Sequence, residues 1–473
     1  MSAHRSEYPQ VVKIFTTSQE TDFAQPWRAH APSRSTGSGV LIAPGRVLTG
    51  AHVVAHATFL QVQHVSGPDR YVAELEAICH DSDLALLRLE HAPALDGVKP
   101  AVIGDLPALR DKVTVVGYPI GGEEISFTEG VVSRIEVQRY SHSQRHLLAV
   151  TVDAAINAGN SGGPVFKGDE VVGIAFQKLD RADNIGEMVP APIIRQFLDG
   201  VAAGRSPQIP GLGIWVQPME NPLLRQSKGM AEGMSGALVL QVQYGSSAWG
   251  ALQAGDVLLS LDGMTVANNL TALYEGRHRT TFEVSIGQRF IGDEVPAEIL
   301  RDGERKTVTL RLAPVSSLIT RCIHTSPRSW FIYGGLVFQP LSHGYLNTWN
   351  RWWESGPKAF ISAYYHGRRT EERQQLVALT QVLSDPLNVG YEDIYDESVE
   401  AVNGVMPRDL AHLVELVEAA EGLVTFTTSR GASLVFDPKV VADRGPEILA
   451  RYQVPADRST DLPGTPVKAI EPE

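Results

Sequence analysis

Short apolar segments separated by Gly, Pro, Asn or Asp recur along residues 8–200. They include Val40–Ile42, Leu60–Val62, Leu84–Leu87, Val113–Val116, Leu147–Val150 and Val171–Ile174. Apolar segments of this length between turn residues are typical of β-strands, and long helices do not alternate with them. The pattern therefore predicts barrels or sandwiches and argues against a doubly wound parallel sheet. One helix is expected near Pro192–Leu198, ending before Gly200.

Two later segments look like divergent copies of one unit. The first copy opens with Gly211–Val216 and continues to Gly255–Gly263, and the second opens with Gly334–Phe338 and continues to Glu400–Gly404. The second copy has an insertion with Trp349, Trp352 and Trp353, a charged and helix-like stretch at 370–379, and a helical pattern at 409–421. The last residues are rich in proline and poor in apolar side chains, so we expect a disordered tail. The expected domains are residues 1–204, 208–313 and 328–447, followed by the tail 451–473.

Composition excludes several classes of protein. The chain has 473 residues, with 41 Lys and Arg against 54 Asp and Glu, which gives a net charge of −13. An acidic chain without a long basic block lacks the positively charged surface that nucleic-acid binding needs. No apolar run approaches the ~18 residues that a membrane span needs. The two cysteines, Cys79 and Cys322, do not make a disulfide framework.

The first residues lack the apolar core of a secretory signal, so we expect a cytoplasmic protein. A trimmed or mis-assigned N-terminus would instead allow the periplasm or an organelle. No G-x-x-x-x-G-K-[ST] motif occurs, and no nucleotide or other cofactor is expected.

The sharpest motif is Gly159–Pro164, with the sequence Gly-Asn-Ser-Gly-Gly-Pro. Glycines around Ser161 allow a tight turn that exposes the hydroxyl and lets backbone N–H groups converge. Such N–H groups can stabilise the oxyanion of a tetrahedral intermediate. On these six residues alone, a plain Gly-rich hairpin turn would fit equally well.

A nucleophilic serine needs a base and an orienting carboxylate. His52 lies upstream in Thr49–Val54, and Asp83 precedes the apolar strand Leu84–Leu87. The order His, Asp, Ser is that of chymotrypsin. Asp81 competes for the carboxylate role, but Asp83 lies directly at the strand entry, so we expect Asp81 to be a turn residue.

Two rival interpretations fail on local context. Residues 159–163 fit the G-x-S-x-G nucleophile elbow, but strand-like segments follow the serine where an α/β hydrolase needs a helix. His52 and His56 have the spacing of a zinc peptidase, but the glutamate beside the first histidine is missing. We therefore expect no metal.

Together these motifs resemble the HtrA (Deg) serine proteases over about residues 9–447. The segments that show it best are Thr49–Val54, Asp83–Leu87 and Asp153–Pro164. Residues 172–177, 184–186, 219–222 and 388–394 resemble the plant Deg subgroup with its divergent second PDZ domain. The resemblance implies a mainly β fold, with a chymotrypsin-like double β-barrel followed by two PDZ domains.

The resemblance also implies the roles of individual residues. Ser161 would be the nucleophile, His52 the general base and Asp83 the group that orients the imidazole. The backbone at Gly159, Asn160 and Ser161 would form the oxyanion hole, in a loop that can flip in HtrA enzymes.

The specificity pocket is expected to be apolar. Trypsin-like cleavage after Lys or Arg needs an Asp six residues before the serine, and this chain has Ala155 there. Ile156, Phe176 and Ile185 are the candidate lining, which favours cleavage after small or medium apolar residues. Glu187 departs from the family pattern: pointing inward it would alter the pocket, and pointing outward it would be a surface residue, which is what we expect.

A PDZ domain captures a peptide's C-terminal carboxylate with backbone N–H groups and then adds the peptide as a strand. Leu212, Gly213 and Ile214 have the form of such a loop, and Gly334–Val337 is a weaker copy. The second PDZ domain could bind peptide or another subunit. HtrA proteins resembling this chain form homotrimers or multiples of trimers through N-terminal aromatic residues; the candidates here are Tyr8, Phe15, Phe23 and Trp27.

Two function classes remain. The first is an ATP-independent serine endopeptidase that degrades unfolded or damaged proteins in protein quality control. The alternative is a holding chaperone or PDZ peptide-binding scaffold whose protease is latent. The complete set of His52, Asp83 and Ser161 favours the first.

Overall fold

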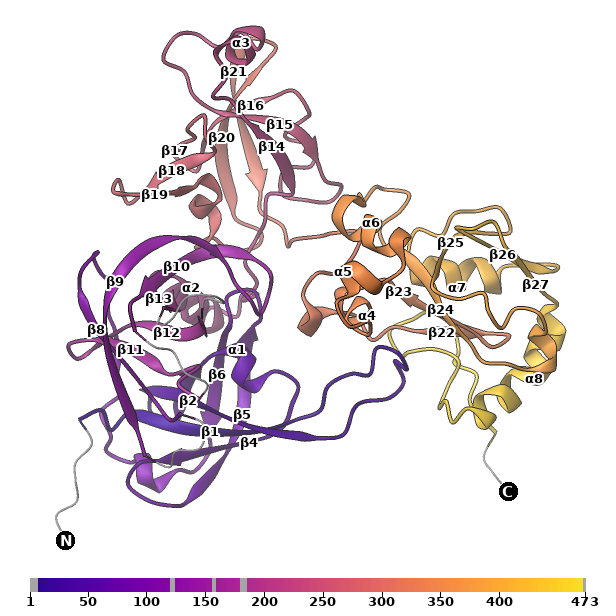
Figure 1. The fold of residues 1–473 in the computed structure, drawn as a ribbon, viewed down its shortest axis with the longest axis horizontal. Coiled ribbons are helices and arrows are strands. Elements are labelled where there is room, and N and C mark those ends of the chain that lie inside the picture. The colour runs from indigo at the N-terminus through magenta and orange to yellow at the C-terminus, as the bar shows by residue number, and fades with distance from the viewer. Residues whose placement is uncertain (1–6, 120–123, 155–158, 179–184, 471–473) are drawn as a thin grey trace. The chain divides into compact units, whose positions relative to one another are not determined.

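The computed structural model describes residues 7–119, 124–154, 159–178 and 185–470. The chain divides into two compact units, Met1–Gln19 with Pro32–Val315 and Glu20–Ala31 with Ser316–Glu473. Each unit is mainly β (Figure 1).

The first unit begins with a closed barrel of six strands in the order β1-β2-β3-β6-β5-β4. The strands are β1 (Val11–Ser18), β2 (Ser33–Ala43), β3 (Arg46–Thr49), β4 (Ala57–His64), β5 (Arg70–Cys79) and β6 (Leu84–Leu89), with helix α1 (Ala51–Val54) after β3. In β6, Leu84 and Leu86 pack in one hydrophobic cluster while Ala85 and Leu87 pack in another. Both faces of this strand are therefore buried, which explains its uninterrupted apolar sequence.

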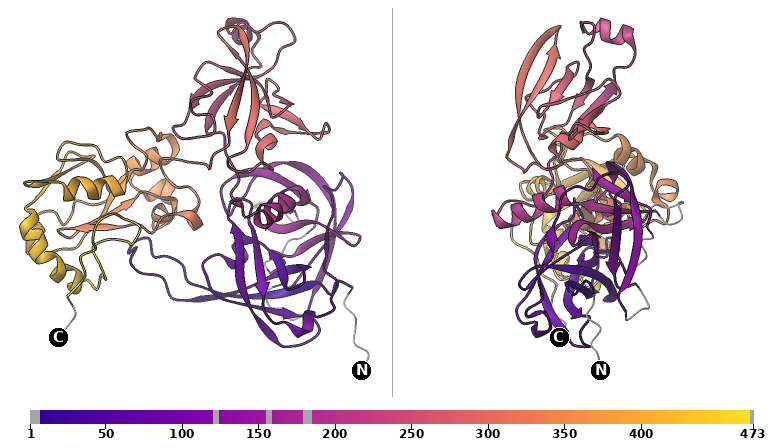
Figure 2. Two further views of the ribbon diagram at one scale, coloured as in Figure 1. Left: turned by 180° about the vertical axis from the view of Figure 1, so that it is seen from behind. Right: turned by 90° about the vertical axis from the view of Figure 1, so that its left-hand side faces the viewer.

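A second barrel follows in the same unit. Its elements are β7 (Val102–Ile103), β8 (Lys112–Gly117), β9 (Ser126–Arg139), β10 (His146–Val152), β11 (Pro164–Lys167), β12 (Glu170–Lys178), β13 (Gly186–Pro190) and α2 (Ala191–Ala202). The order is β11-β8-β9-β10-β13-β12, closed by pairing of β11 with β12, while β7 adds parallel to β12. Helix α2 packs on β12 and β13 (Figure 2). Its Ile193, Ile194 and Phe197 are buried in the same hydrophobic cluster as residues of both strands.

The rest of the first unit is built on a sheet in the order β14-β15-β16-β20-β21, with β17 paired to β16. Its strands are β14 (Ile214–Pro218), β15 (Ala237–Val242), β16 (Val257–Leu261), β17 (Met264–Thr265), β20 (Glu294–Arg301) and β21 (Glu304–Arg311). Helix α3 (Pro222–Ser227) follows β14, and β18 (Thr271–Tyr274) and β19 (His278–Thr281) form a separate two-stranded sheet. Strand β14 forms one edge of this sheet. The mainly β fold expected from the sequence is confirmed.

The second unit is built on a six-stranded sheet in the order β22-β23-β24-β25-β26-β27. Its elements are β22 (Phe331–Tyr333), β23 (Leu336–Pro340), α4 (His343–Leu346), α5 (Trp352–Ser355), α6 (Lys358–His366), β24 (Val377–Val382), β25 (Glu397–Val402), α7 (Leu410–Glu418), β26 (Val424–Thr428), β27 (Ser433–Phe436) and α8 (Pro438–Arg451). The helix expected at 370–379 is wrong, because β24 begins within it at Val377 and pairs with β23 and β25. Tertiary pairing overrides the helical composition there.

The β1–β2 connection belongs to the second unit at residues 20–31. Phe23 is only 9% exposed and packs in a cluster with Leu341, Tyr345 and Phe360. A Cβ at Gly344 would lie 2.4 Å from the Phe23 ring, so glycine makes room for it. Trp27 packs against the cluster of Ile332 and Val337. In this structure Phe23 therefore belongs to the second unit's core, and Trp27 is half-buried against that core.

The disordered tail expected from Arg451 onward is wrong for the described residues. Ile332 N donates to Asp457 O at 2.6 Å, and Ser459 N donates to Trp330 O at 3.0 Å. Arg458 is 5% exposed and pairs with Glu418 at 2.6 Å. The tail extends the edge at β22 and satisfies its polar groups there, through distant partners that composition cannot reveal.

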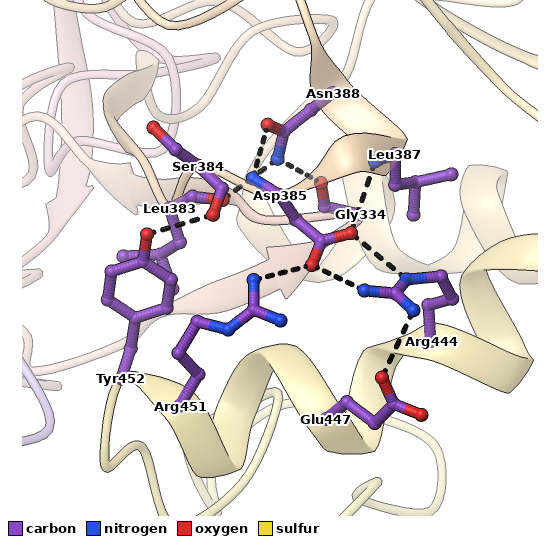
Figure 3. Close-up of polar contacts among 10 residues, drawn as sticks. All are labelled: Gly334, Leu383, Ser384, Asp385, Leu387, Asn388, Arg444, Glu447, Arg451 and Tyr452. Carbon is purple, nitrogen blue, oxygen red and sulfur yellow. Dashed lines mark hydrogen bonds and ion pairs between the residues drawn. The ribbon is translucent and has the colours of Figure 1, made fainter.

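A buried carboxylate fastens α8 to the sheet of the second unit (Figure 3). Asp385 accepts hydrogen bonds from Arg444 Nε at 3.0 Å, Arg444 Nη2 at 2.7 Å and Arg451 Nη1 at 2.8 Å. The Arg444 hydrogen bond holds the pKa of Asp385 below its ordinary value. Asn388 Nδ2 donates to Gly334 O at 2.8 Å, which ties the same turn to the glycines before β23.

We expect Asp385→Ala to destabilise the second unit by about 2–3 kcal/mol. Removing one partner of a buried ion pair costs roughly 3–5 kcal/mol, and the two guanidinium groups here are partly exposed and can be rehydrated. Hydrogen exchange of α8 in the full-length protein measures the effect. Asp443→Ala removes an exposed carboxylate from the same helix and should stay within about 0.5 kcal/mol. Equal protection in the two variants would contradict the prediction.

Candidate active site

His52 and Asp83 meet in the first barrel. His52 lies in α1, just after β3, and Asp83 lies in the turn before β6. His52 Nδ1 and Asp83 Oδ2 are 2.7 Å apart, and the His52 backbone N–H donates to Asp83 Oδ1 at 2.8 Å. Both carboxylate oxygens therefore hold the histidine, one at the ring and one at the start of the helix.

Burial and charge set the protonation of this pair. The Asp83 side chain is 1% exposed and the His52 side chain 26%. Burial raises the pKa of Asp83, but the charge and hydrogen bond of His52 lower it more, so it lies below its ordinary value. Burial lowers the pKa of His52, but the Asp83 charge and hydrogen bond raise it above its ordinary value. Asp83 therefore stays ionised and stabilises an imidazolium.

The turn with Ser161 approaches the His52 segment closely. A Cβ at Gly162 would lie 2.4 Å from Thr49 Oγ1 and 2.9 Å from Val53, so only glycine permits the approach. Gly159 has φ 101, a conformation that also favours glycine. Among the described residues, the buried His52 Nε2 has no hydrogen-bond partner, nor does the Asn160 side-chain amide. Catalytic hydrogen bonds in free enzymes often form only with substrate.

Only some of the residues expected to line the specificity pocket are among those that the structure describes. Ala155 and Ile156 lie outside the described residues. Phe176 is 4% exposed and packs on Tyr140 with ring centroids 4.4 Å apart, and Ile185 is half-buried just before β13.

The expectation that Glu187 points to solvent is wrong. Its side chain is fully buried in β13 and accepts a hydrogen bond from Gln177 of the neighbouring β12. Burial raises the pKa of Glu187. Pairing of β13 with both β10 and β12 encloses the side chain, which the position of Glu187 in the sequence did not indicate.

Sequence reasoning missed a pair of histidines beside the His52–Asp83 contact. The His142 ring lies 6.2 Å from the His52 ring, centroid to centroid, and His142 Nε2 is 2.9 Å from His80 Nδ1. Burial lowers the pKa of His142 to about 4 and also lowers that of His80. Both rings are thus uncharged near neutral pH. His80 lies close to Asp83 in the sequence, but nothing local pointed to His142.

Asp81 lies in the turn, as expected, and contacts different residues from Asp83. Its Oδ2 is 3.1 Å from Arg145 Nη1 and accepts a hydrogen bond from Ile209 N at 3.0 Å. Asp81 therefore holds the linker after α2, while Asp83 holds His52.

The loop expected to bind a peptide carboxylate precedes the edge strand β14. Gly213 has φ 69, and a Cβ there would lie 2.2 Å from Ser246 Cβ. Leu212 is 2% exposed and belongs to the core, so its side chain supports the loop from behind. Ile214 begins β14, which among the described strands pairs with β15 alone. This edge can accept an added strand.

The corresponding edge in the second unit is already paired. Strand β23 follows Gly334 and Gly335 and pairs with β24, but its other side pairs with β22. A peptide cannot add to β23 while β22 occupies that position.

Two further features bear on function. No group of three or more His, Cys, Asp or Glu side chains in the described part of the chain could hold a metal ion. Within the same residues, no helix has the length and apolar character that crossing a membrane requires.

Comparisons with known proteins place this site in a family. Residues 37–174 match the trypsin-like peptidase domain, and residues 210–312 and 320–461 each match a PDZ domain. The chain is 37% identical to protease Do-like 2, chloroplastic, of Arabidopsis thaliana, over 96% of this chain and 75% of that protein. It is 34% identical to putative protease Do-like 3, mitochondrial, of the same plant, over 96% and 80%.

Solved structures agree in fold. The HtrA-type protease AlgW with tripeptide is 25% identical, with a TM-score of 0.50 over 65% of this chain and 95% of that chain. Together with the plant relatives, these matches show that the chain belongs to the HtrA/Deg family of serine proteases, with a trypsin-like peptidase domain followed by two PDZ domains.

Proposed function

We propose that the chain is an ATP-independent endopeptidase in which Ser161 attacks the peptide carbonyl. His52 takes the serine proton and returns it to the leaving amine, and Asp83 holds the imidazole tautomer. Backbone N–H groups of Gly159 and Ser161, with the Asn160 peptide between them, bind the oxyanion. The observation that supports this most is the 2.7 Å contact between His52 Nδ1 and the buried Asp83 carboxylate.

We further propose that substrates are unfolded or damaged proteins, cleaved after small or medium apolar residues. Apolar Phe176 and Ile185, with Ile156 and no acidic residue at position 155, support this preference. The experiment that tests the function is a gel assay on an unfolded protein, with the wild type beside Ser161→Ala. Cleavage-site sequencing by mass spectrometry then tests the preference, and cleavage mainly after Lys or Arg would contradict it.

Activity should fall at acid pH because protonated His52 cannot act as a base. Asp83 raises the pKa of His52, so the acid limb of kcat/KM should lie above the ordinary histidine value of about 6.5. Below that pKa the rate should drop about tenfold per pH unit. His80 and His142, whose pKa values are lowered, should not contribute to this limb. A midpoint below about pH 5, with the fold intact by circular dichroism, would contradict the assignment.

The first PDZ domain should bind free C-termini of apolar peptides through Leu212, Gly213 and Ile214. Full-length Ser161→Ala protein is the right sample, because the peptides then stay intact. Amidation removes the carboxylate charge and its charge-assisted hydrogen bonds, so amidated peptides should bind about tenfold worse or more. Calorimetry measures the difference. Equal affinities would show that the groove does not recognise a chain terminus.

The same peptides should change the cleavage rate of the wild type. Binding shifts an equilibrium only if the peptide favours the active arrangement around Gly159 and Asn160. Binding without a rate change would make the domain a tether for substrate.

The alternative, a holding chaperone with a latent protease, gains support from His52 Nε2, which has no hydrogen-bond partner among the described residues. The gel assay separates the two, because a holdase would prevent aggregation without cleavage. Assembly into homotrimers or their multiples is also proposed, and light scattering measures it. The cytoplasmic location stays a prediction.

A further inference from the structure

Ser38 lies where the first barrel meets the loop that holds Ser161. It stands in the middle of β2 and is fully buried. Its Oγ donates a hydrogen bond to Gly159 O at 2.7 Å and accepts one from Tyr118 N at 2.8 Å. Tyr118 follows β8 of the second barrel. One hydroxyl thus links a strand of the first barrel to two segments of the second.

The backbone of Ser38 strengthens the same link. Its N–H donates to Ser161 O at 3.0 Å, and its carbonyl accepts from Thr49 Oγ1 at 2.7 Å. Gly163 N donates to Asn160 O at 2.9 Å. The carbonyl oxygens of Gly159, Asn160 and Ser161 are therefore all engaged, two of them by Ser38.

These contacts determine how the loop presents its N–H groups. A peptide unit is planar, and in the trans form its C=O and N–H point in opposite directions. The Gly159–Asn160 peptide lies between the two proposed oxyanion donors, Gly159 N and Ser161 N. Rotating this peptide would break the bond from Ser38 Oγ. Because the donors Gly159 N and Ser161 N lie in the two neighbouring peptide units, a change in the torsion angles at Gly159 and Asn160 that the chain does not compensate would also move one donor relative to the other.

We propose that Ser38 is a positioning residue for the oxyanion hole: its hydroxyl holds the Gly159–Asn160 peptide in the orientation that stabilises the tetrahedral intermediate. The inference rests on the proposed function of Ser161. It adds a role for a residue that lies 121 positions before Gly159 in the sequence.

Packing around Ser38 leaves little freedom for the hydroxyl. A Cβ at Gly117 would lie 2.7 Å from Ser38 Oγ and 3.0 Å from Asn160 Cα, and one at Gly163 would lie 3.1 Å from Ser38 Cβ. Glycines therefore let two segments close around the serine. Without Oγ, the buried Gly159 carbonyl and Tyr118 N–H would lose a partner, which favours a different loop orientation.

The test is steady-state kinetics of full-length Ser38→Ala on an apolar peptide substrate. Removing a direct oxyanion donor costs about 10²–10³ in kcat, so loss of its support should lower kcat by about 10- to 100-fold with little change in KM. Affinity for a peptide boronic acid, whose serine adduct places an oxygen in the oxyanion hole, should fall by a similar factor. The acid limb of the pH profile should stay unchanged, because His52 and Asp83 are intact.

A matched control is Thr16→Val, which removes another buried hydroxyl-to-carbonyl bond in the same barrel, from Thr16 Oγ1 to Val53 O at 2.8 Å. It should keep kcat within about twofold, since oxyanion donors are untouched. Ser38→Cys, with a weaker S–H donor at the same position, should recover part of the lost rate. If Ser38→Ala does not fold, the boronic acid measurement is made on Ser38→Cys instead. A positioning role predicts that this substitution weakens binding of the boronic acid by a larger factor than it raises KM.

Unchanged kcat in folded Ser38→Ala, or a rise in KM alone, would overturn the proposal. Ser161→Ala is measured beside it. If Ser161→Ala is inactive while Ser38→Ala is fully active, only the role of Ser38 fails. If Ser161→Ala still cleaves, the proposed nucleophile itself is wrong.

Discussion

Ser161→Ala is expected to lower kcat/KM by about 10⁶-fold, the loss seen when a serine protease loses its nucleophile. The variant removes the one oxygen that the proposed mechanism uses as its nucleophile. The loop itself should keep its shape. Its backbone carbonyl oxygens, which the substitution leaves in place, accept hydrogen bonds from Ser38 and Gly163. Hydrolysis of a fluorogenic apolar peptide measures the loss over this range.

Two controls make that result interpretable. Thermal unfolding should match the wild type, and peptide binding at the first PDZ domain should be unchanged. Labelling of the wild type by a fluorophosphonate, absent in the variant, confirms that the attacked atom is Ser161 Oγ. Rapid cleavage by pure Ser161→Ala protein would show that Ser161 is not the nucleophile.

Asp83→Asn is expected to lower kcat by about 10⁴-fold at neutral pH. Asparagine has nearly the same shape, but its amide N–H₂ facing His52 Nδ1 stabilises the tautomer with the proton on Nε2. That tautomer cannot accept the proton of Ser161. The effect should be large because Asp83 is 1% exposed, so solvent does little to compensate for the lost carboxylate charge.

Asp81→Asn is the matched comparison, two residues away in the same turn. Its carboxylate faces Arg145 and the linker at Ile209, and asparagine can still accept the Ile209 hydrogen bond. We expect a loss of only a few-fold. The pH profile separates the two variants, because Asp83→Asn also removes the group that raises the pKa of His52. The reverse ranking of rates would show that Asp81, and not Asp83, orients the base.

Features specified by neighbouring residues could be predicted from the sequence. The Gly-Asn-Ser-Gly-Gly turn needs glycine at fixed offsets, and Asp83 enters a strand whose apolar run is buried on both faces. The family and the mainly β fold followed from such segments, because hydrophobic pattern and turn chemistry act over a few residues.

The tertiary structure decided what depends on partners far apart in the chain. The hydroxyl of Ser38 meets Gly159 across 121 positions, and Gln339 meets Phe23 across 316. The tail covers β22, and pairing of β13 with two strands buries Glu187. The local sequence around these residues does not distinguish a buried, hydrogen-bonded position from an exposed one. Their burial and hydrogen bonds arise only when strands from separate parts of the chain meet.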